Sequence, residues 1–336
     1  MEYITLGKTG LRVSRMGFGG IPIQKVNASV THALMERLAQ RGVNYIDTAR
    51  GYTVSEQFLG EALEDGLREK FVVATKSMAR TKEAMARDID ISLKNLRTDY
   101  IDLYQIHNSS LAELEQVLAP GGALEALMEA KAAGKIRHLG LTAHMAAVFE
   151  RALELDWVET VMFPYNIVET QGEELMAKCR EKNVGFICMK PMAGGALEDA
   201  RLALRFIRQN ENVSVVIPGM YDIREIDENL SAMEDISALT SDELAKIETI
   251  RKELGTQFCR RCNYCQPCTA GISISGIFVL EGYLRRYGLG DWAQKRYDAL
   301  NKKAGDCVGC GACEKRCPYQ LPIRQMLARC KQEFGA

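Results

Sequence analysis

The chain has 336 residues, of which 47% are hydrophobic and 26% are charged, as in a globular protein with a buried core. Lys and Arg number 43 against 44 Asp and Glu, and this net charge of -1 argues against a general nucleic-acid-binding protein. The N-terminus shows no signal peptide, and apolar runs such as Ile272–Leu280 are too short to span a bilayer. We therefore expect a cytoplasmic protein without nucleic-acid or membrane partners.

Residues 1–254 alternate short apolar or β-branched runs with amphipathic segments. The stretch Ile4–Val13, with two glycines, predicts a small hairpin that precedes this alternation. Eight runs predict strands, and they are Met16–Phe18, Tyr45–Asp47, Phe71–Thr75, Ile101–Gln105, Ile136–Thr142, Thr160–Pro164, Gly185–Met189 and Val213–Ile217. The segments between them carry apolar residues at three- and four-residue intervals, which is typical of helices. Eight such units in about 250 residues predict an α/β protein with a (β/α)8 TIM barrel.

An open, doubly wound sheet is the alternative architecture for this alternation. Such a sheet usually carries a GxGxxG fingerprint after its first strand. The glycines at 17, 19 and 20 lack that spacing, so the barrel is favoured. A last barrel helix is predicted to begin after Thr240, with Glu243 three residues further on as in a capping box.

The distribution of charge and cysteine predicts a second domain. From residue 256 onward the chain has 13 Lys and Arg against 6 Asp and Glu, whereas the rest carries a net charge of -8. Nine of the 11 cysteines lie in this basic tail, and eight of these nine are closely spaced. We therefore expect a barrel over residues 1–254 and a separate small domain over 255–336.

The cysteines form two closely spaced runs. They are Cys259, Cys262, Cys265, Cys268, Cys307, Cys310, Cys313 and Cys317. Disulfides are disfavoured in a reducing cytoplasm, and zinc is the alternative for CxxC pairs. The second run, which ends Cys317-Pro318, resembles the bacterial ferredoxin motif, in which the fourth cysteine serves the other cluster. The first run departs from it, with two residues instead of three before Cys268 and Thr269 in place of proline.

The ferredoxin resemblance implies two [4Fe–4S] clusters with crossed ligands. One cluster is expected on Cys259, Cys262, Cys265 and Cys317. The other cluster is expected on Cys268, Cys307, Cys310 and Cys313. Four basic residues inside the cysteine loops, Arg260, Arg261, Lys315 and Arg316, are candidates either to offset cluster charge or to bind an acidic ferredoxin-type electron partner.

Polar residues follow three successive predicted strands. Asp47 and Tyr52 come after the second strand, Lys76 after the third and His107 after the fourth. Chemistry in a barrel of this kind takes place at the carboxyl ends of its strands. We therefore expect these four side chains to meet at one rim.

At this point the sequence resembles the aldo/keto reductase family over about residues 1–250. The segments that carry the resemblance are LGKTGLRVSRMGFGG, NYIDTARGY, SEQFLGEAL, DYIDLYQIH, and IPGM followed by ENL. It implies an oxidoreductase that binds NAD(P)H across the strand ends and interconverts a small-molecule carbonyl and an alcohol. Its catalytic tetrad corresponds to Asp47, Tyr52, Lys76 and His107.

Chemistry agrees with the roles that the resemblance implies. An alkoxide formed from a carbonyl must be protonated, and a tyrosine with a pKa of about 10 is a reluctant donor at neutral pH. A nearby ammonium favours the phenolate and lowers that pKa. Lys76 is placed to do this, Asp47 to keep Lys76 charged, and His107 to donate a hydrogen bond to the carbonyl oxygen.

The resemblance also implies contacts to the dinucleotide. The expected residues are Thr142, Asn166, Lys190, Pro191, Ile217, Gly219, Met220, Arg224, Glu228 and Asn229. Met162 stands where a glutamine is frequent, and Met189 replaces an aromatic residue that stacks on the nicotinamide. Arg224, near a predicted helix N-terminus, is a candidate for the 2'-phosphate and favours NADP over NAD. Arg50, with Lys190, is a candidate for an anionic group on the substrate.

Three functions remain open from the sequence. The first is NAD(P)H-dependent reduction of a carbonyl with Tyr52 as general acid, the clusters serving structure or electron transfer. The second is a ferredoxin-linked oxidoreductase in which the clusters pass single electrons to the barrel site. The third is a redox-sensing protein that binds a nucleotide without catalysis.

Overall fold

The computed structural model describes residues 1–335. They form two compact units. The barrel unit contains Met1–Asn166, Thr170–Pro191 and Asp199–Ala238. The cysteine unit contains Ile167–Glu169, Met192–Glu198 and the chain from Leu239 onward. This division differs from the expected boundary after residue 254, because the helix α10 (Ser241–Gly255) groups with the cysteines.

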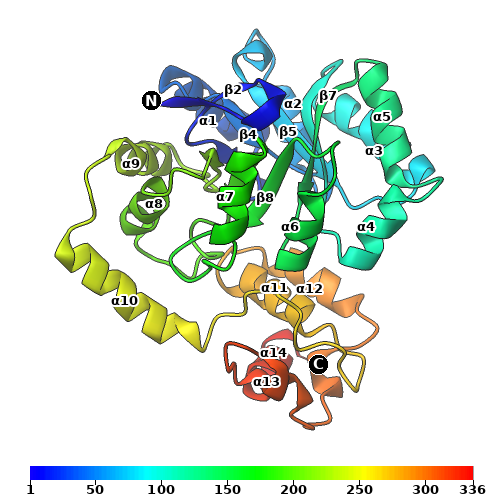
Figure 1. Cartoon of the computed structure of the whole chain (residues 1–336), viewed down its shortest axis with the longest axis vertical. Helices are drawn as coiled ribbons and strands as arrows, with labels where there is room; N and C mark the ends of the chain where they lie inside the picture. The colour runs from blue at the N-terminus through cyan, green and yellow to red at the C-terminus, as the bar shows by residue number, and fades with distance from the viewer. Residues whose placement is uncertain (336) are drawn as a thin grey trace. The chain divides into compact units, whose positions relative to one another are not determined.

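The barrel unit is built on one parallel sheet, whose strands in the described chain number eight (Figure 1). They are β3 (Phe18–Gly19), β4 (Tyr45–Asp47), β5 (Val72–Ser77), β6 (Ile101–Ile106), β7 (Ile136–Thr142), β8 (Thr160–Pro164), β9 (Gly185–Met189) and β10 (Val215–Val216). Parallel bridges between Met16 and Val216 and between Gly19 and Gly219 join the first strand to the last. The sheet therefore closes into a barrel, as the sequence predicts.

The connections between the strands are helical. The helices are α1 (Ala28–Gln40), α2 (Ser55–Ala62), α3 (Lys82–Asn95), α4 (Leu111–Leu118), α5 (Ala123–Ala132), α6 (Ala146–Ala152), α7 (Glu173–Glu181), α8 (Ala200–Arg208) and α9 (Ile223–Glu234). Side-chain caps fix where several begin; Asn27 accepts from the Val30 N–H and Thr81 from the Ala84 N–H. Before the barrel, β1 (Tyr3–Thr5) and β2 (Arg12–Ser14) pair antiparallel, which confirms the predicted hairpin.

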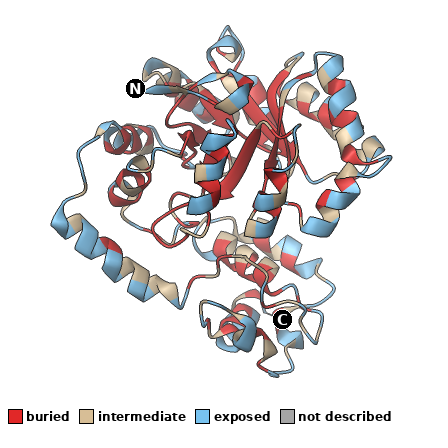
Figure 2. Ribbon diagram, in the orientation of Figure 1, coloured by how far each residue is buried: buried red, intermediate tan, exposed pale blue. Residues whose placement is uncertain are grey.

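Burial follows the pattern expected of a barrel. In Figure 2 the strands are buried and the helices have an exposed outer face. Side chains from alternate strand positions, including Tyr45, Leu103, Ile187 and Val215, fill the barrel interior. A larger cluster lies between the strands and the surrounding helices. Strands that are buried on both faces need continuous apolar runs, which is why these runs identify them in the sequence.

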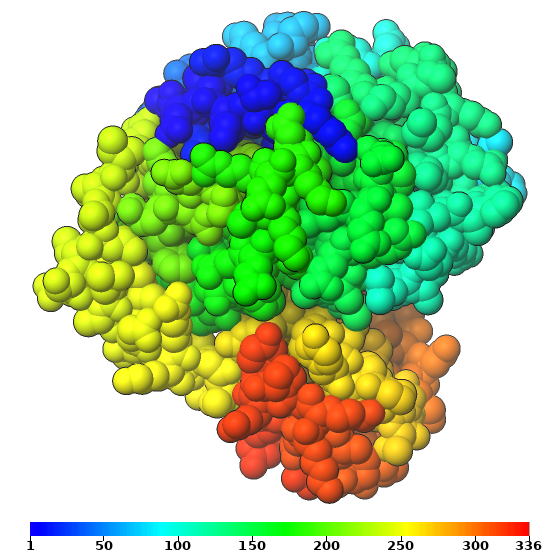
Figure 3. Space-filling view, in the orientation of Figure 1, coloured from blue at the N-terminus to red at the C-terminus, as the bar shows by residue number. Residues whose placement is uncertain are grey.

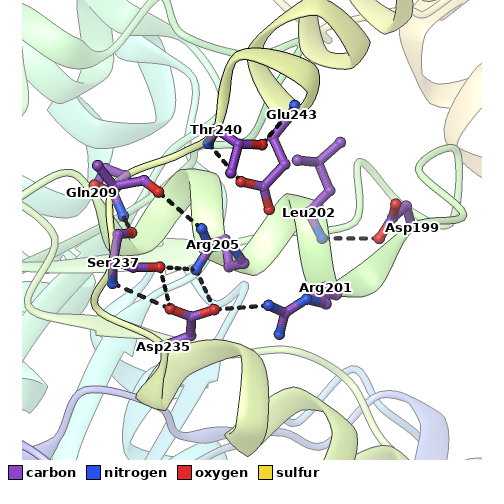
Figure 4. A network of polar contacts seen from close by, with 10 residues as sticks. Asp199, Arg201, Leu202, Arg205, Gln209, Asp235, Ser237, Thr240 and Glu243 are labelled. Carbon is purple, nitrogen blue, oxygen red and sulfur yellow. Dashed lines mark hydrogen bonds and ion pairs between the residues drawn. The ribbon is translucent and has the colours of Figure 1, made fainter.

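A buried arginine joins α8 to the segment after α9 (Figure 4). The Arg205 side chain is 2% exposed, and its Nη1 lies 2.5 Å from Asp235. Asp235 also pairs with Arg201 at 2.7 Å and accepts from the Ser237 hydroxyl. These donors hold the pKa of Asp235 far below its ordinary value, the Ser237 hydrogen bond acting most strongly. The network fastens the last helices of the barrel unit.

The cysteine unit is mainly helical. After α10 it contains α11 (Ile274–Arg285), α12 (Gly290–Asp298), α13 (Ala312–Arg316) and α14 (Ile323–Phe334). Thr240 and Glu243 form the predicted capping box at the start of α10. An apolar core of its own includes Ile277, Leu327 and the stacked rings of Tyr297 and Phe334. Across residues 1–335, no helix combines the length and apolarity needed to traverse a membrane.

Candidate active site and cysteine centres

Three neighbouring strands bring the predicted catalytic residues to one rim. Asp47 is the last residue of β4, Lys76 lies near the end of β5, and His107 follows β6. Because β4, β5 and β6 are adjacent and parallel, their carboxyl ends meet. Tyr52 lies in the short loop between β4 and α2. The strands thus hold Asp47 and Lys76, whereas loops present Tyr52 and His107.

Lys76 and Asp47 form a buried ion pair at this rim. The Lys76 ammonium donates to Asp47 Oδ1 and, at 2.9 Å, to the carbonyl of Thr48. Gln105 Nε2 donates to the other carboxylate oxygen at 3.2 Å. Lys76 is 1% exposed and Asp47 is 2% exposed. Each charge therefore depends on the other, because neither reaches bulk solvent.

Burial shifts both members of this pair. It raises the pKa of Asp47 and lowers the pKa of Lys76, while their mutual attraction and hydrogen bond oppose both shifts. The lowered pKa of Lys76 reflects an ammonium that lacks water around it. Such an ammonium acts strongly on any nearby group whose charge changes, since little solvent screens it.

Tyr52 and His107 lie against that ammonium. Lys76 Nζ is 4.8 Å from the centre of the Tyr52 ring, and the rings of Tyr52 and His107 meet edge to face at 6.1 Å. Burial lowers the pKa of His107 well below its ordinary value, with further contributions from Lys76, Arg80 and Lys190. The imidazole is therefore neutral at pH 7. Of the residues described, none forms a hydrogen bond with its buried Nδ1 atom.

Arg80, which was not predicted from the sequence, holds the backbone of His107 in place. Its Nη2 donates to the backbone carbonyl of His107 at 2.8 Å, and its side chain is buried. Gln105 was also missed, although its place next to Ile106-His107 at a strand end was a usable signal. Arg80 gave no such signal, because its contact depends on two loops folding together.

Arg50, the candidate for an anionic substrate group, is engaged by the protein. Its Nη1 donates to Glu56 at 2.8 Å, and Glu56 is 1% exposed. Glu56 also accepts from Thr75, Ser92 and Asn95. The guanidinium thus neutralises a buried carboxylate. Arg50 therefore pairs with a glutamate six residues further along the chain.

Two of the expected nicotinamide contacts are buried polar side chains with protein partners. Thr142 Oγ1 accepts from the Asn108 N–H at 2.8 Å. Asn166 Nδ2 donates to the Lys190 carbonyl at 2.9 Å, and Lys190 itself adopts a left-handed φ of 57°. Pro191 follows directly. These contacts shape the backbone at the ends of β7, β8 and β9.

The other expected nucleotide contacts lie around β10 and α9. Ile217 faces the barrel interior and Met220 belongs to the core between sheet and helices, so neither side chain is exposed. Asn229 is also buried, whereas Arg224 and Glu228 are exposed and lie 3.9 Å apart. Gly219 contacts Pro22, against which a Cβ would clash. Of this group, Arg224 and Glu228 present charge to solvent.

The eight cysteines of the two runs gather into two sets. All 11 cysteines are free thiols, which excludes the disulfide reading. Cys317 lies near enough to raise the pKa of both Cys259 and Cys262, an effect smaller than that of burial. The pKa of Cys265 is raised mainly by burial and further by its neighbours Cys259 and Cys262. This proximity agrees with the crossed ligand set, in which Cys317 joins the first run.

The second set lines a single hollow. Its lining includes all four cysteines expected for the second cluster, Cys268, Cys307, Cys310 and Cys313. Cys310 is exposed, and Thr269 Oγ1 lies 3.0 Å from its sulfur. Within residues 1–335, no three His, Cys, Asp or Glu side chains are arranged to bind one metal ion. Four cysteine thiols are the donor set that a [4Fe–4S] cluster takes.

The two CxxCxxC loops have the same backbone shape. In each loop the residues on either side of the middle cysteine have left-handed φ angles. They are Arg261 (58°) and Asn263 (62°) in the first loop and Gly309 (70°) and Gly311 (72°) in the second. The turns direct backbone N–H groups at sulfur; those of Arg261 and Tyr264, for example, donate to Cys259 and Cys262. Such donors stabilise thiolates.

The first loop uses arginine where the second uses glycine, and its side chain explains why. Arg261 Nη2 donates to the carboxylate of Glu169, which is fully buried. Arg260, also buried, donates to the Val168 carbonyl at 2.9 Å. Of the four basic loop residues, these two thus turn inward, whereas Lys315 and Arg316 are exposed.

Comparison with known proteins agrees with both parts of the chain. The model of the "Aldo/keto reductase family" matches residues 15–201, and that of the "4Fe-4S dicluster domain" matches residues 258–322. L-galactose dehydrogenase of Arabidopsis thaliana is 27% identical over 303 residues, covering 74% of this chain and 94% of that protein. Aldo-keto reductase YhdN of Bacillus subtilis is 28% identical over 228 residues, covering 59% and 66%.

Among solved structures, the aldo-keto reductase AKR11C1 from Bacillus halodurans in its holo form matches with a TM-score of 0.65 and 26% identity. The match covers 74% of this chain and 96% of that one. The family match extends over more than half of the chain, and the barrel with its rim agrees with it. The chain is therefore an oxidoreductase that belongs to the aldo/keto reductase family and carries a C-terminal 4Fe-4S dicluster domain.

Proposed function

We propose that the barrel reduces a small carbonyl compound with NAD(P)H, Tyr52 acting as the general acid. The observation that carries this proposal is the desolvated Lys76 ammonium, 4.8 Å from the Tyr52 ring and fixed by Asp47. A buried cation in this place lowers the cost of forming a phenolate. The reduced nicotinamide, when bound, supplies the hydride.

The chain's own residues then handle the proton and the developing charge. Neutral His107 lies at the rim, and its buried Nδ1 has no hydrogen-bond partner among the described residues, so the imidazole is available to donate a hydrogen bond to a carbonyl oxygen. Tyr52 gives its proton to that oxygen, and Lys76 stabilises the phenolate that remains. Asp47 and Gln105 keep the ammonium charged and in place.

The residues present also fit a dinucleotide. Thr142, Asn166, Lys190 and Pro191 form the rim at the ends of β7–β9, and Arg224 offers an exposed cation for a 2'-phosphate, which favours NADP. Glu56 already neutralises Arg50, so the proposed substrate is a carbonyl compound with no required anionic group. We place this reaction in the cytoplasm.

The two clusters take no direct part in the proposed hydride transfer. A hydride carries two electrons, whereas a [4Fe–4S] cluster exchanges one, so we assign the clusters to single-electron transfer or to the stability of the cysteine unit. Cys259, Cys262, Cys265 and Cys317 would hold the first, and the four cysteines around the hollow would hold the second.

Replacing Tyr52 by phenylalanine tests the proposal. With NADPH and a panel of small aldehydes and ketones, Tyr52→Phe should lower kcat at least 100-fold, because the ring remains but the acidic proton is lost. Tyr3→Phe, which removes only a hydrogen bond to the Gly42 carbonyl in the hairpin region, is the matched control. Equal activity of both variants would refute the role of Tyr52, whereas the absence of turnover in the parent protein would favour nucleotide binding without catalysis.

A second candidate function is favoured by the nicotinamide contacts. Met162 and Met189 stand at positions where the family resemblance implies polar and aromatic partners, and both are buried. A ferredoxin-linked oxidoreductase would pass cluster electrons to the barrel without nicotinamide. Anaerobic turnover of substrate with chemically reduced clusters and no NAD(P)H would support it, and absence of turnover would count against it.

A further inference from the structure

We infer that the surface around Cys310 is the docking site for a small acidic protein that carries one electron. The inference rests on the part of the proposed function that assigns a [4Fe–4S] cluster to Cys268, Cys307, Cys310 and Cys313. It goes further in naming where electrons cross the protein surface and the chemistry of the protein that brings or removes them.

The two cluster sites differ in their access to solvent. Cys262, the middle cysteine of the first loop, is half-buried, and the arginines of that loop turn inward to Val168 and Glu169. Cys310 of the second set is exposed. Its neighbour Val308 is 70% exposed, although it is apolar. A partner protein can therefore approach the second site through the loop at residues 307–310, with an apolar side chain at the point of contact.

Positively charged side chains lie around the exposed Val308. Arg316 and Arg324 line the same hollow as Val308 and Cys310. Lys315 precedes Arg316 at the end of α13, and both are exposed. The orange and red spheres of Figure 3 belong to this end of the chain and lie on the face shown. The rim thus offers positive charge beside the most accessible cluster ligand.

Local acidic groups cancel only part of that charge. Arg324 pairs with Glu314 at 2.7 Å. Arg316 donates to the carbonyls of Pro267 and Ala312, which are uncharged. In the described chain, neither Lys315 nor Arg316 pairs with a carboxylate. A cluster with four thiolates has a formal charge of about -2 when oxidised, so uncompensated cations at its rim reduce the repulsion of an acidic partner.

The chemistry of the transfer is a single-electron exchange. The reduced carrier loses one electron and becomes oxidised, and the cluster on the second set takes that electron; no bond forms and no proton moves. Complementary charge steers such encounters and raises their rate, and added salt weakens the effect because it shortens the range of the field. An apolar centre with a charged rim suits a brief contact of this kind.

Lys315→Glu tests the site, with a purified acidic two-[4Fe–4S] ferredoxin as the probe. In anaerobic stopped-flow mixing at low salt, the reduced ferredoxin should reduce Lys315→Glu about tenfold more slowly than the parent protein, and the difference should shrink at high salt. Lys315→Gln should show a smaller loss in the same direction. Lys94→Glu, the same charge reversal at an exposed site on α3 of the barrel unit, is the matched control.

Four further measurements make the result decisive. Binding of the oxidised ferredoxin by calorimetry should weaken in Lys315→Glu but not in Lys94→Glu, while iron and sulfide contents and reduction by a small viologen stay unchanged. Equal effects of the two reversals, or rates that do not respond to salt, would overturn the docking site. NADPH-dependent carbonyl reduction should be unaltered in Lys315→Glu. The docking site and the proposed role of Tyr52 are therefore tested by different variants, and either can fail without the other.

Discussion

Arg261 in the first cysteine loop sets two physical effects against each other. Its φ of 58° is a left-handed conformation that costs an ordinary residue about 1–2 kcal/mol, and the second loop has Gly309 at the same position. Arg261→Gly removes that cost. It also deprives the fully buried Glu169 of its guanidinium partner, and breaking a buried ion pair costs about 3–5 kcal/mol. We therefore expect Arg261→Gly to destabilise the cysteine unit by about 2–3 kcal/mol.

Loss of the cluster absorbance in urea measures this change. Protein purified without oxygen is incubated for a fixed time at increasing urea, and midpoints are compared between variants, because unfolding of a cluster-bearing unit need not be reversible. With a slope of about 1–3 kcal/mol per molar urea, the midpoint of Arg261→Gly should fall by roughly 1 M.

Glu169→Gln is the control, because it removes the buried negative charge that Arg261 neutralises. In the double variant with Arg261→Gly, the buried carboxylate is absent, so most of the lost stability should return. A midpoint for Arg261→Gly equal to or above that of the parent protein would refute the reasoning. It would show that backbone strain outweighs the ion pair with Glu169.

Three other changes test the remaining parts of the structure. Cys317→Ser should remove roughly half of the bound iron and leave the spectrum of one cluster, whereas Cys330→Ser, a buried thiol outside both sets, should keep all of it. Asp47→Asn leaves Lys76 buried without a carboxylate, so kcat should fall about 100-fold; a kcat-versus-pH profile checks this. Glu159, just before β8, is hydrogen-bonded by His138, Lys131 and the Leu139 N–H, and these bonds outweigh its burial and lower its pKa from 4.5 to about 2. The ionised Glu159 should add about 1 kcal/mol, after solvent screening, to the free energy of unfolding above pH 4.5, and this stabilisation should vanish toward pH 2. The difference in urea midpoint between the parent protein and Glu159→Gln, measured at pH 7 and pH 3, checks this.

Local patterns were enough to predict the barrel. Strands buried on both faces require continuous apolar runs, so all eight strands are found at or within a few residues of the runs. In parallel strands the carboxyl ends share an edge, so the four polar residues at or just after the ends of β4, β5 and β6 were expected to be neighbours. The spacing of the cysteines likewise predicted two cluster sets, because a tight loop is needed to aim three thiolates at one cube.

Contacts between distant segments could not be predicted in this way. Arg80 meets the backbone of His107 across 27 residues, and Arg261 meets Glu169 across 92 residues. Nothing in the periodicity of the chain distinguishes these arginines from exposed ones. Met220 was expected at the nucleotide and lies in the core instead, since the direction of one side chain at a strand end depends on the packing around it.

The same limit explains the four basic residues in the cysteine loops. The sequence alone establishes their number and their nearness to the ligands. Tertiary structure decides that Arg260 and Arg261 point inward while Lys315 and Arg316 remain exposed. Burial of a guanidinium requires acceptors such as the Val168 carbonyl and the Glu169 carboxylate, and those come together only when residues 167–169 fold beside the first loop.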